Sequence, residues 1–432
     1  MKRRLSPLQT GLIGAAVTGV VALLLGSRPA AGQSPRPSFA KDPVALLEEQ
    51  IQRREVKLDY LEKGQGFLPS LLTRLDVNVD SQMLVFSKTS FHADLIGPKA
   101  PRAVYFNDNV FIGFTQRGDI ELAALDPTRG IVFYTLEATP KREPRFLHRD
   151  AECASCHGLS GSSSLLTQSV FPDPDGNALF LPGLTPPPPD HTTPIEQRWG
   201  GWYVTGTHGS QRHMGNAVVP DPYASSDLEQ EGTQNLTSLR AKVDLRPYLA
   251  QTSDLVALMT FEHQLRMSNL IARISRQARE VEQSTTVEGP ASESLNTGIE
   301  EMLKYMLFVE ETPLREPIRG VSSFTTTFPA RGPRDSQGRS LRDFDLQTRV
   351  FRYPLSYMIY SASFEAIPDS VKAQLYKRLY DILTNRDTSS AFARLTAADR
   401  KAIFEILRAT KPNLPGYWEM PRASAAAPAP AK

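Results

Sequence analysis

The chain has 432 residues, of which 40% are hydrophobic and 22% charged, a composition typical of globular proteins with two or three packed units. Its formal net charge of +2 depends on Lys2, Arg3, Arg4 and Arg28, because the first 32 residues contain no acid. Without these four cations, the 49 basic residues fall to 45 against 47 acidic ones. The rest of the chain therefore has no excess of basic residues that would attract nucleic acid, and we do not expect a nucleic-acid partner.

The N-terminus has the pattern of an export signal, which we assign to residues 1–32. A basic start precedes an apolar run at 12–25, and small residues at 30–32 offer a cleavage point before Gln33. The apolar run is shorter than the roughly 18–20 residues of a spanning helix, so cleavage is favoured over an uncleaved tether. We therefore expect a periplasmic protein that has no membrane span after signal cleavage.

The next region, residues 42–140, is predicted to contain one helix and a β-meander. Asp42 should cap the helix with Pro43 at its first position, and Leu47, Ile51, Leu58 and Leu61 form an apolar stripe at helical spacing. Four runs rich in Val, Ile, Phe or Tyr follow, separated by turn residues, at 102–106, 110–115, 119–125 and 131–136. We interpret these runs as the strands of an antiparallel meander.

Residues 141–250 form a loop-rich region that includes the stretch ECASCHG at 152–158. Asp150 is predicted to cap a short helix that carries this stretch and ends at Gly158. Long irregular segments are uncommon in a compact domain unless they are functional. We therefore expect this region to enclose a bound group.

The region 251–420 is predicted to be mostly helical, which makes the whole chain an α+β protein. We expect helices over 253–280, 295–310, 369–383 and 397–409, the last with a capping box made by Thr396 and Asp399. The Ala/Pro-rich tail at 421–432 is expected to be disordered.

The two cysteines of the chain, Cys153 and Cys156, lie three positions apart, and His157 follows directly. C-x-x-C followed by His is the attachment signature of a c-type haem, in which both thiols form thioethers and the imidazole binds iron. One helical turn places both sulfurs along one porphyrin edge and the next imidazole under the iron. A redox-active dithiol is the alternative, whereas a closed zinc site would need four ligands. We predict one covalent haem c, with His157 as an iron ligand.

The ligand on the other face of the iron distinguishes an electron carrier from a catalyst, because an open position admits small molecules. The stretch RWGGWYVTGTHGSQRHMGN at 198–216 offers Met214, His213 and His208 on a glycine-rich loop. His263 is a further alternative, although a histidine in a stripe of Leu and Met is more often an interior residue. We take Met214 as the first choice and keep the three histidines as alternatives.

Three arginines near these segments, Arg149, Arg198 and Arg212, are candidates for pairing with haem propionates, since guanidinium matches carboxylate in a fork. An ordinary surface role is favoured for each of them. The residues around His191 do not suggest a role as an iron ligand, and we expect this histidine to be structural or exposed.

The chain resembles a family of large bacterial periplasmic proteins that carry a single c-type haem. The resemblance rests on the export signal, the CASCH motif after Arg149 and Asp150, the WGGWYVTGTHG stretch and FRYPLSYMIYS at 351–361, and it extends over about residues 47–418. It implies haem binding and electron transfer, and no particular substrate. A single-haem carrier needs only roughly 100 residues, so this chain departs from a small soluble cytochrome.

We therefore predict a c-type cytochrome that transfers electrons between periplasmic redox partner proteins. The alternative is a haem-dependent, peroxidase-like oxidoreductase with an open sixth iron position, which the surplus of chain favours. A third hypothesis is a sensing module, whose helical half docks a partner while the haem reports redox state or a gas.

Overall fold

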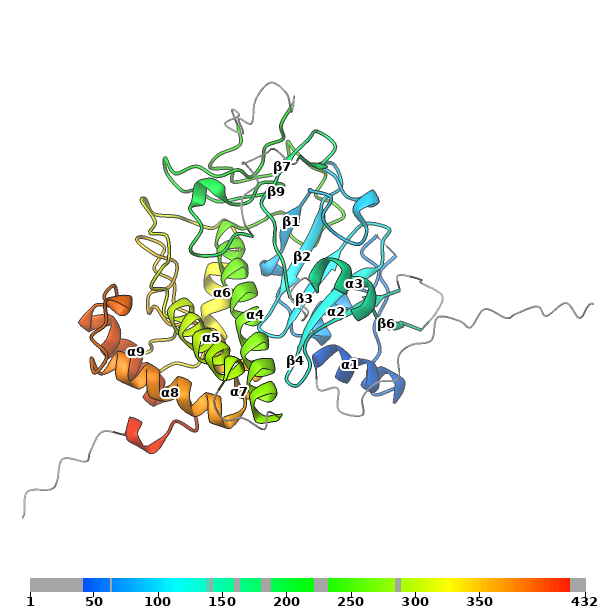
Figure 1. The fold of residues 1–432 in the computed structure, drawn as a ribbon. Coiled ribbons are helices and arrows are strands. Elements are labelled where there is room, and N and C mark those ends of the chain that lie inside the picture. Colours follow the sequence, from blue (N-terminus) through cyan, green and yellow to red (C-terminus); the bar gives the residue numbers. More distant parts are fainter. Residues whose placement is uncertain are drawn as a thin grey trace, which may run out of the picture. The chain divides into compact units, whose positions relative to one another are not determined.

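A seven-stranded antiparallel sheet organises the first half of the chain, as Figure 1 shows for a computed structural model. The strand order is β6-β5-β4-β3-β2-β1-β9, so β2 to β5 form the predicted meander and shorter strands extend it at both edges. The four predicted strands are confirmed to within one residue at each end. The strands are β1 (Met83–Val85), β2 (Arg102–Phe106), β3 (Val110–Phe114), β4 (Ile120–Asp126), β5 (Gly130–Leu136), β6 (Phe146–His148) and β9 (Trp202–Tyr203), while β7 (Phe171–Pro172) and β8 (Ala178–Leu179) pair separately.

The structure describes residues 42–62, 64–137, 139, 143–158, 164–179, 188–220, 232–283 and 289–419. The predicted export signal at 1–32 and the predicted tail at 421–432 lie outside these residues, as does the side chain of Cys156 within its helix. The described residues all fall within one compact unit, Pro37–Lys432.

The described residues also form helices, most of which lie in the second half of the chain, and this confirms the α+β class. They are α1 (Pro43–Gln52), α2 (Leu68–Arg74), α3 (Asp150–His157), α4 (Leu255–Gln283), α5 (Pro290–Met306), α6 (Phe324–Ala330), α7 (Ala362–Glu365), α8 (Asp369–Leu383) and α9 (Ala397–Thr410). Short 3-10 helices lie at Val79–Ser81, Ala93–Leu95, Ile195–Gln197, Tyr357–Tyr360, Ser390–Phe392 and Gly416–Trp418.

The predicted helix boundaries agree closely with the structure for α4, α8 and α9. The predicted capping box at the start of α9 is also present, with Thr396 and Asp399 bonding each other's backbone N–H. Helix α5 begins and ends several residues earlier than predicted, because Pro290 starts it and the left-handed conformation of Phe308 prevents its continuation.

Helix α1 is capped by Asp42, as predicted, through bonds of 3.0 and 3.1 Å from Val44 N–H and Ala45 N–H. It ends at Gln52, and Arg54 then adopts a positive φ of 59°. The prediction of one helical stripe that continues through Leu58 and Leu61 is therefore wrong. Leu58 is buried in the core beyond the helix, whereas Leu61 is exposed.

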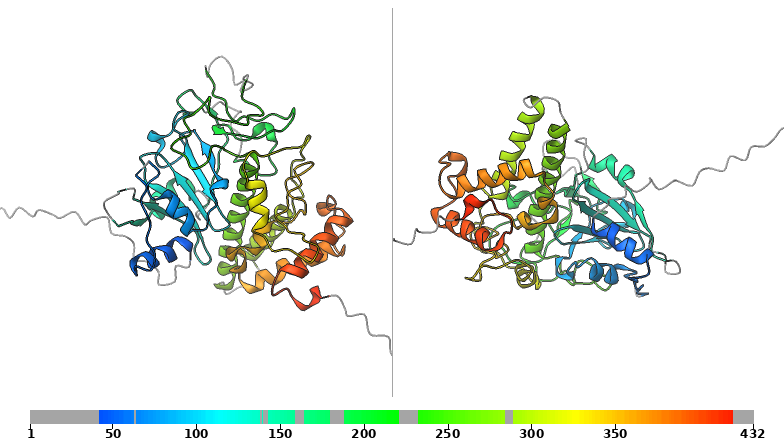
Figure 2. Two further views of the ribbon diagram at one scale, coloured as in Figure 1. Left: turned by 180° about the vertical axis from the view of Figure 1, so that it is seen from behind. Right: turned by 90° about the horizontal axis from the view of Figure 1, so that it is seen from below.

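Both faces of the sheet are buried. One face packs with α3 and α4 and contributes every second residue of the strands to a large core, for example Val104, Phe111 and Phe133. The opposite face packs with α1 and α2 through the intervening residues, for example Tyr105 and Ile112. Because successive strand side chains alternate between faces, this double burial explains why the strands are apolar at nearly every position. Figure 2 shows α3 and α1 on opposite sides of the sheet in the view from below.

The 29-residue helix α4 joins the sheet to the later helices. It contacts β5, α5, α6 and α7, and Figure 1 shows it between the sheet and the pair α8 and α9. Asp254 caps its start, with Oδ1 accepting from Val256 N–H at 2.8 Å. The other carboxylate oxygen accepts from Val321 N–H and Ser322 N–H at 2.7 and 2.8 Å, so one side chain fixes both α4 and a distant loop.

Candidate functional site

Helix α3, which carries the CASCH motif, is anchored to strand β5. Arg149 donates its backbone N–H to Phe133 O at 2.9 Å and its Nε–H to Thr135 Oγ1 at 3.1 Å. Asp150 Oδ1 accepts from Phe133 N–H at 2.8 Å. The helix ends at His157, next to Gly158, as predicted. It begins at Asp150, which was predicted to precede the helix as its cap. The carboxylate of Asp150 therefore ties α3 to the sheet.

His157, the last residue of α3, is held in one orientation. Its Nδ1 lies 2.7 Å from the carbonyl oxygen of Ser164, and its ring packs on Phe133 with centroids 4.9 Å apart. A carbonyl oxygen only accepts hydrogen bonds, so Nδ1 carries the proton and Nε2 keeps its lone pair. Burial lowers the pKa of His157, which keeps the imidazole neutral at pH 7. This is the form in which histidine binds a metal through Nε2.

Cys153 is a half-buried free cysteine that packs against the core on the α4 side of the sheet. Burial raises the pKa of its thiol to about 11, and the carboxylates of Glu121, Glu152 and Asp150 add to this effect. Catalytic thiols of redox enzymes have lowered pKa values instead, because the thiolate is their nucleophile. The surroundings of Cys153 therefore disfavour the redox-active dithiol that the sequence left open.

An ion pair between Arg102 and Glu121 lies on the sheet face that carries His157. In the strand register Glu121 is opposite Gly113 on one side and Thr135 on the other. The Arg102 guanidinium lies over Gly113, where a Cβ would overlap it. Neither Arg102 nor Glu121 was predicted as part of the site, although each is a charged residue in a mostly apolar strand.

The alternatives His208 and His213 pack against each other, with ring centroids 4.8 Å apart. The Nδ1 of His208 donates to Gln211 O at 2.6 Å, and its Nε2 accepts from Asn235 N–H at 3.1 Å. The Nδ1 of His213 accepts from Gly215 N–H at 3.0 Å, so the proton of the neutral ring is on Nε2. In this arrangement neither ring has a free lone pair for a metal.

His263, the third alternative, lies inside the core and has both ring nitrogens engaged. Its Nδ1 is 2.8 Å from Nδ1 of His191, and its Nε2 is 2.8 Å from Ser356 Oγ. The rings of Tyr305 and Phe308 stack against it. His191 was predicted to be structural or exposed, and it is buried like His263.

Met214 is buried in a small apolar cluster with Ala217 and Val219. Its sulfur accepts a hydrogen bond from Ser169 Oγ at 3.6 Å. A hydrogen bond from a hydroxyl to a thioether sulfur is weak. Of the four candidates, Met214 therefore loses the least hydrogen-bond energy if its ligating atom moves to a metal.

The expectation of a surface role is wrong for Arg198, which is 1% exposed. Its Nη1 pairs with Glu262 at 3.3 Å, and its Nε donates to Thr193 O at 2.7 Å. Arg149 is partly exposed and pairs with Glu152 at 3.1 Å, while Arg212 is exposed. Arg198 is therefore committed to the protein interior and is not available to a propionate.

Buried histidines make the fold sensitive to acid. Burial lowers the pKa of His263 to about 3, whereas a histidine in an unfolded chain has a pKa of about 6.5. Below the pKa of the unfolded state, the unfolded chain binds a proton that the folded protein excludes, so the free energy of unfolding falls as the pH decreases. When the pH falls from 7 to 5, the free energy of unfolding should therefore decrease by about 2 kcal/mol less in His263→Gln than in the wild type. Urea titrations at the two pH values measure both decreases. Parallel losses in the two proteins would contradict this assignment.

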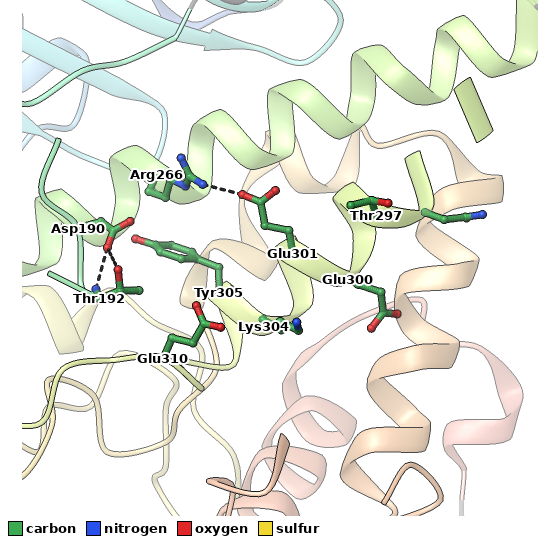
Figure 3. A pocket seen from close by; sticks show the side chains of 10 residues that line it. Asp190, Thr192, Arg266, Thr297, Glu300, Glu301, Lys304, Tyr305 and Glu310 are labelled. Carbon is green, nitrogen blue, oxygen red and sulfur yellow. Dashed lines mark hydrogen bonds and ion pairs between the residues drawn. The ribbon is translucent and has the colours of Figure 1, made fainter. Parts of the chain in front are cut away.

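A groove of about 710 Å³ lies between α4 and α5 (Figure 3). Several of its charges are paired: Arg266 bonds Glu301 at 2.6 Å, and Glu300 bonds Arg378, also at 2.6 Å. Its lining comes from α4, α5, Asp190, Thr192 and Glu310 and includes no described side chain of α3. We therefore treat the groove separately from the motif.

Two described side chains of α3, those of Cys153 and His157, have the chemistry that attachment of a haem c requires. Cys153 has a protonated thiol outside any disulfide, and His157 presents Nε2 with its lone pair. Beside them, Arg102 Nε and Glu121 Oε1 are buried and have no hydrogen-bond partner among the described residues. A polar group bound beside α3 would give these two atoms partners.

Within the described ranges, no cluster of three or more His, Cys, Asp or Glu side chains is placed to hold a metal ion. None of the helices in this part of the chain is long and apolar enough to cross a membrane. No family model, curated protein or solved structure matches the chain. The surroundings of α3 therefore carry the functional assignment.

Proposed function

We propose that this protein is a periplasmic c-type cytochrome, with one haem bound covalently by Cys153 and Cys156 and with His157 as an iron ligand. The observation that carries the proposal is the 2.7 Å contact between His157 Nδ1 and the Ser164 carbonyl, next to a C-x-x-C motif. It leaves Nε2 as the ligating atom and fixes the plane of the imidazole. When bound, the haem supplies an iron that changes oxidation state by one electron.

The chain's own residues keep the ligand in place. Asp150 and Arg149 tie the start of α3 to β5, and Ser164 fixes the end of the helix by accepting from His157 Nδ1. Phe133 packs on the imidazole and shields one of its faces from water. A ligand held this firmly moves little when the charge of the metal changes, which favours fast electron transfer.

The proposal is tested with the full chain, produced in bacteria that also make the haem-attachment machinery. We expect the purified periplasmic protein to retain haem on a denaturing gel, as a peroxidase-active band at the mass of the chain. Covalent attachment survives denaturation, whereas a noncovalent haem does not. A protein that is folded and exported but shows no such band would contradict the proposal.

The second candidate is a haem-dependent oxidoreductase with an open sixth iron position. The observation that favours it is that the ring nitrogens of His208, His213 and His263 are occupied by other partners or protonated. Of the four residues considered as sixth ligand, this leaves Met214, whose sulfur bonds Ser169.

Cyanide binding separates the two functions in the haem-loaded protein. An open position predicts a high-spin resting spectrum and fast cyanide binding that Met214→Ala leaves unchanged. Ligation by Met214 predicts a low-spin spectrum, slow cyanide binding, and a change to high spin in Met214→Ala. A low-spin spectrum that this substitution does not alter would contradict both expectations and point to histidine.

A further inference from the structure

The ion pair between Arg102 and Glu121 is unusual for its position in the sheet. The two side chains are 21% and 15% exposed, and they lie on the face whose other positions are mostly core residues such as Val104 and Phe133. Removing charges from water is costly, and a protein in which well-packed apolar residues replace a buried ion pair is often at least as stable. Stability of the sheet alone therefore does not account for this pair.

The sheet is also shaped to hold the pair. Arg102 reaches Glu121 across β3, and the guanidinium lies over Gly113, where any side chain would overlap its Nη2, Cζ and Nε atoms. One atom of each partner, Arg102 Nε and Glu121 Oε1, remains without a hydrogen bond among the described residues. The pair is thus held in place but not fully satisfied within the protein.

Both charges lie on the part of the sheet that holds the motif. Glu121 is opposite Thr135 in β5, and Phe133, on the same face of that strand, packs on the His157 ring with centroids 4.9 Å apart. Arg149, which precedes α3, donates its Nε–H to the same Thr135 at 3.1 Å. Charges at the margin of a buried site interact strongly, because the effective dielectric constant there is far below that of water. A change in charge at the iron would therefore be felt by this pair.

We propose that the Arg102–Glu121 ion pair sets the reduction potential of the haem iron bound by His157. This inference rests on the proposed function. On reduction, one electron enters from a reduced partner protein, and no bond forms or breaks. The Arg102 cation favours the reduced state and raises the potential, whereas the Glu121 anion favours the oxidised state and lowers it. Their balance fixes the working value.

The test is a potentiometric titration of the haem-loaded full chain, followed by its optical spectrum. Glu121→Gln should raise the reduction potential, and Arg102→Met should lower it. Arg102→Lys keeps the charge and should stay near the wild type, while the double substitution of Arg102→Met and Glu121→Gln should largely restore the wild-type value. Shifts of opposite sign distinguish an electrostatic role from a merely structural one.

Two further variants serve as controls. Gly113→Ala keeps both charges but forces the guanidinium away from its position, so it should lower the potential less than Arg102→Met. Lys377→Met removes a cation from α8, which Figure 1 shows on the far side of α4 from α3, and should leave the potential unchanged. If Arg102→Met does not fold, the isosteric Glu121→Gln decides by itself, because a lower or unchanged potential contradicts the inference.

The outcomes separate this inference from the proposed function. A wild type without covalent haem overturns both. Haem-loaded variants whose potentials are unchanged, or shift in the same direction, overturn the role of the ion pair and leave the cytochrome assignment intact.

Discussion

Replacing Cys153 and Cys156 together by serine is expected to abolish covalent haem attachment. A hydroxyl does not form the thioether that joins each cysteine to the porphyrin, and serine has nearly the same volume as cysteine. The variant should therefore be exported and folded, with an unchanged far-ultraviolet circular dichroism spectrum. Its haem stain on a denaturing gel should fall to background, against a strong band for the wild type.

His157→Gln is the matched control for the cysteine variant. It keeps both thiols but removes the nitrogen that Ser164 orients, so the haem stain should persist while the optical spectrum changes. Haem that stays bound through denaturation in the double serine variant would show that attachment takes place elsewhere in the chain.

Arg198→Met is expected to destabilise the fold by roughly 3–5 kcal/mol, the usual cost of leaving one member of a buried ion pair alone. The substitution removes the partner of Glu262, which is 2% exposed, and the donors to Thr193 O and His191 O. Burial raises the pKa of Glu262 and the Arg198 guanidinium lowers it, so the loss of Arg198 leaves a buried carboxyl without the cation that favours its charged form. Urea unfolding monitored by circular dichroism measures the loss directly.

A double variant tests the cause of that loss. When Arg198→Met is combined with Glu262→Met, no carboxyl remains buried without its partner, so part of the lost stability should return. Arg246→Met breaks an exposed ion pair with Asp244 and should unfold at nearly the wild-type urea concentration. A single Arg198→Met variant as stable as the wild type would show that the pair does not support the core.

The sheet was predictable where its signals are local. Strands β2 to β5 are mostly apolar runs of five to seven residues with turn residues between them, and each pairs with its neighbour in sequence. The short strands β1, β6 and β9 have only two or three residues, too few for a pattern to stand out. The pairing of β1 with β9 also joins segments more than 100 residues apart, which no local signal reveals.

The site was predictable to the same extent. The C-x-x-C-H motif is contiguous, so its helix and the end of that helix next to Gly158 followed from the sequence, whereas its start lies at the predicted cap, Asp150. The state of each histidine depends on partners brought by tertiary structure, such as Ser164 for His157 and His191 for His263. Arg198 was assigned to the surface because its partner Glu262 lies 64 positions away, in α4.

The most direct test of the central claim is mass spectrometry of the proteolytic peptide that contains Cys153 to His157, isolated from periplasmic protein. We predict that this peptide carries the mass of one haem, joined to both cysteines. A peptide with two free thiols, or one lighter by two hydrogens because a disulfide joins Cys153 to Cys156, would contradict the account.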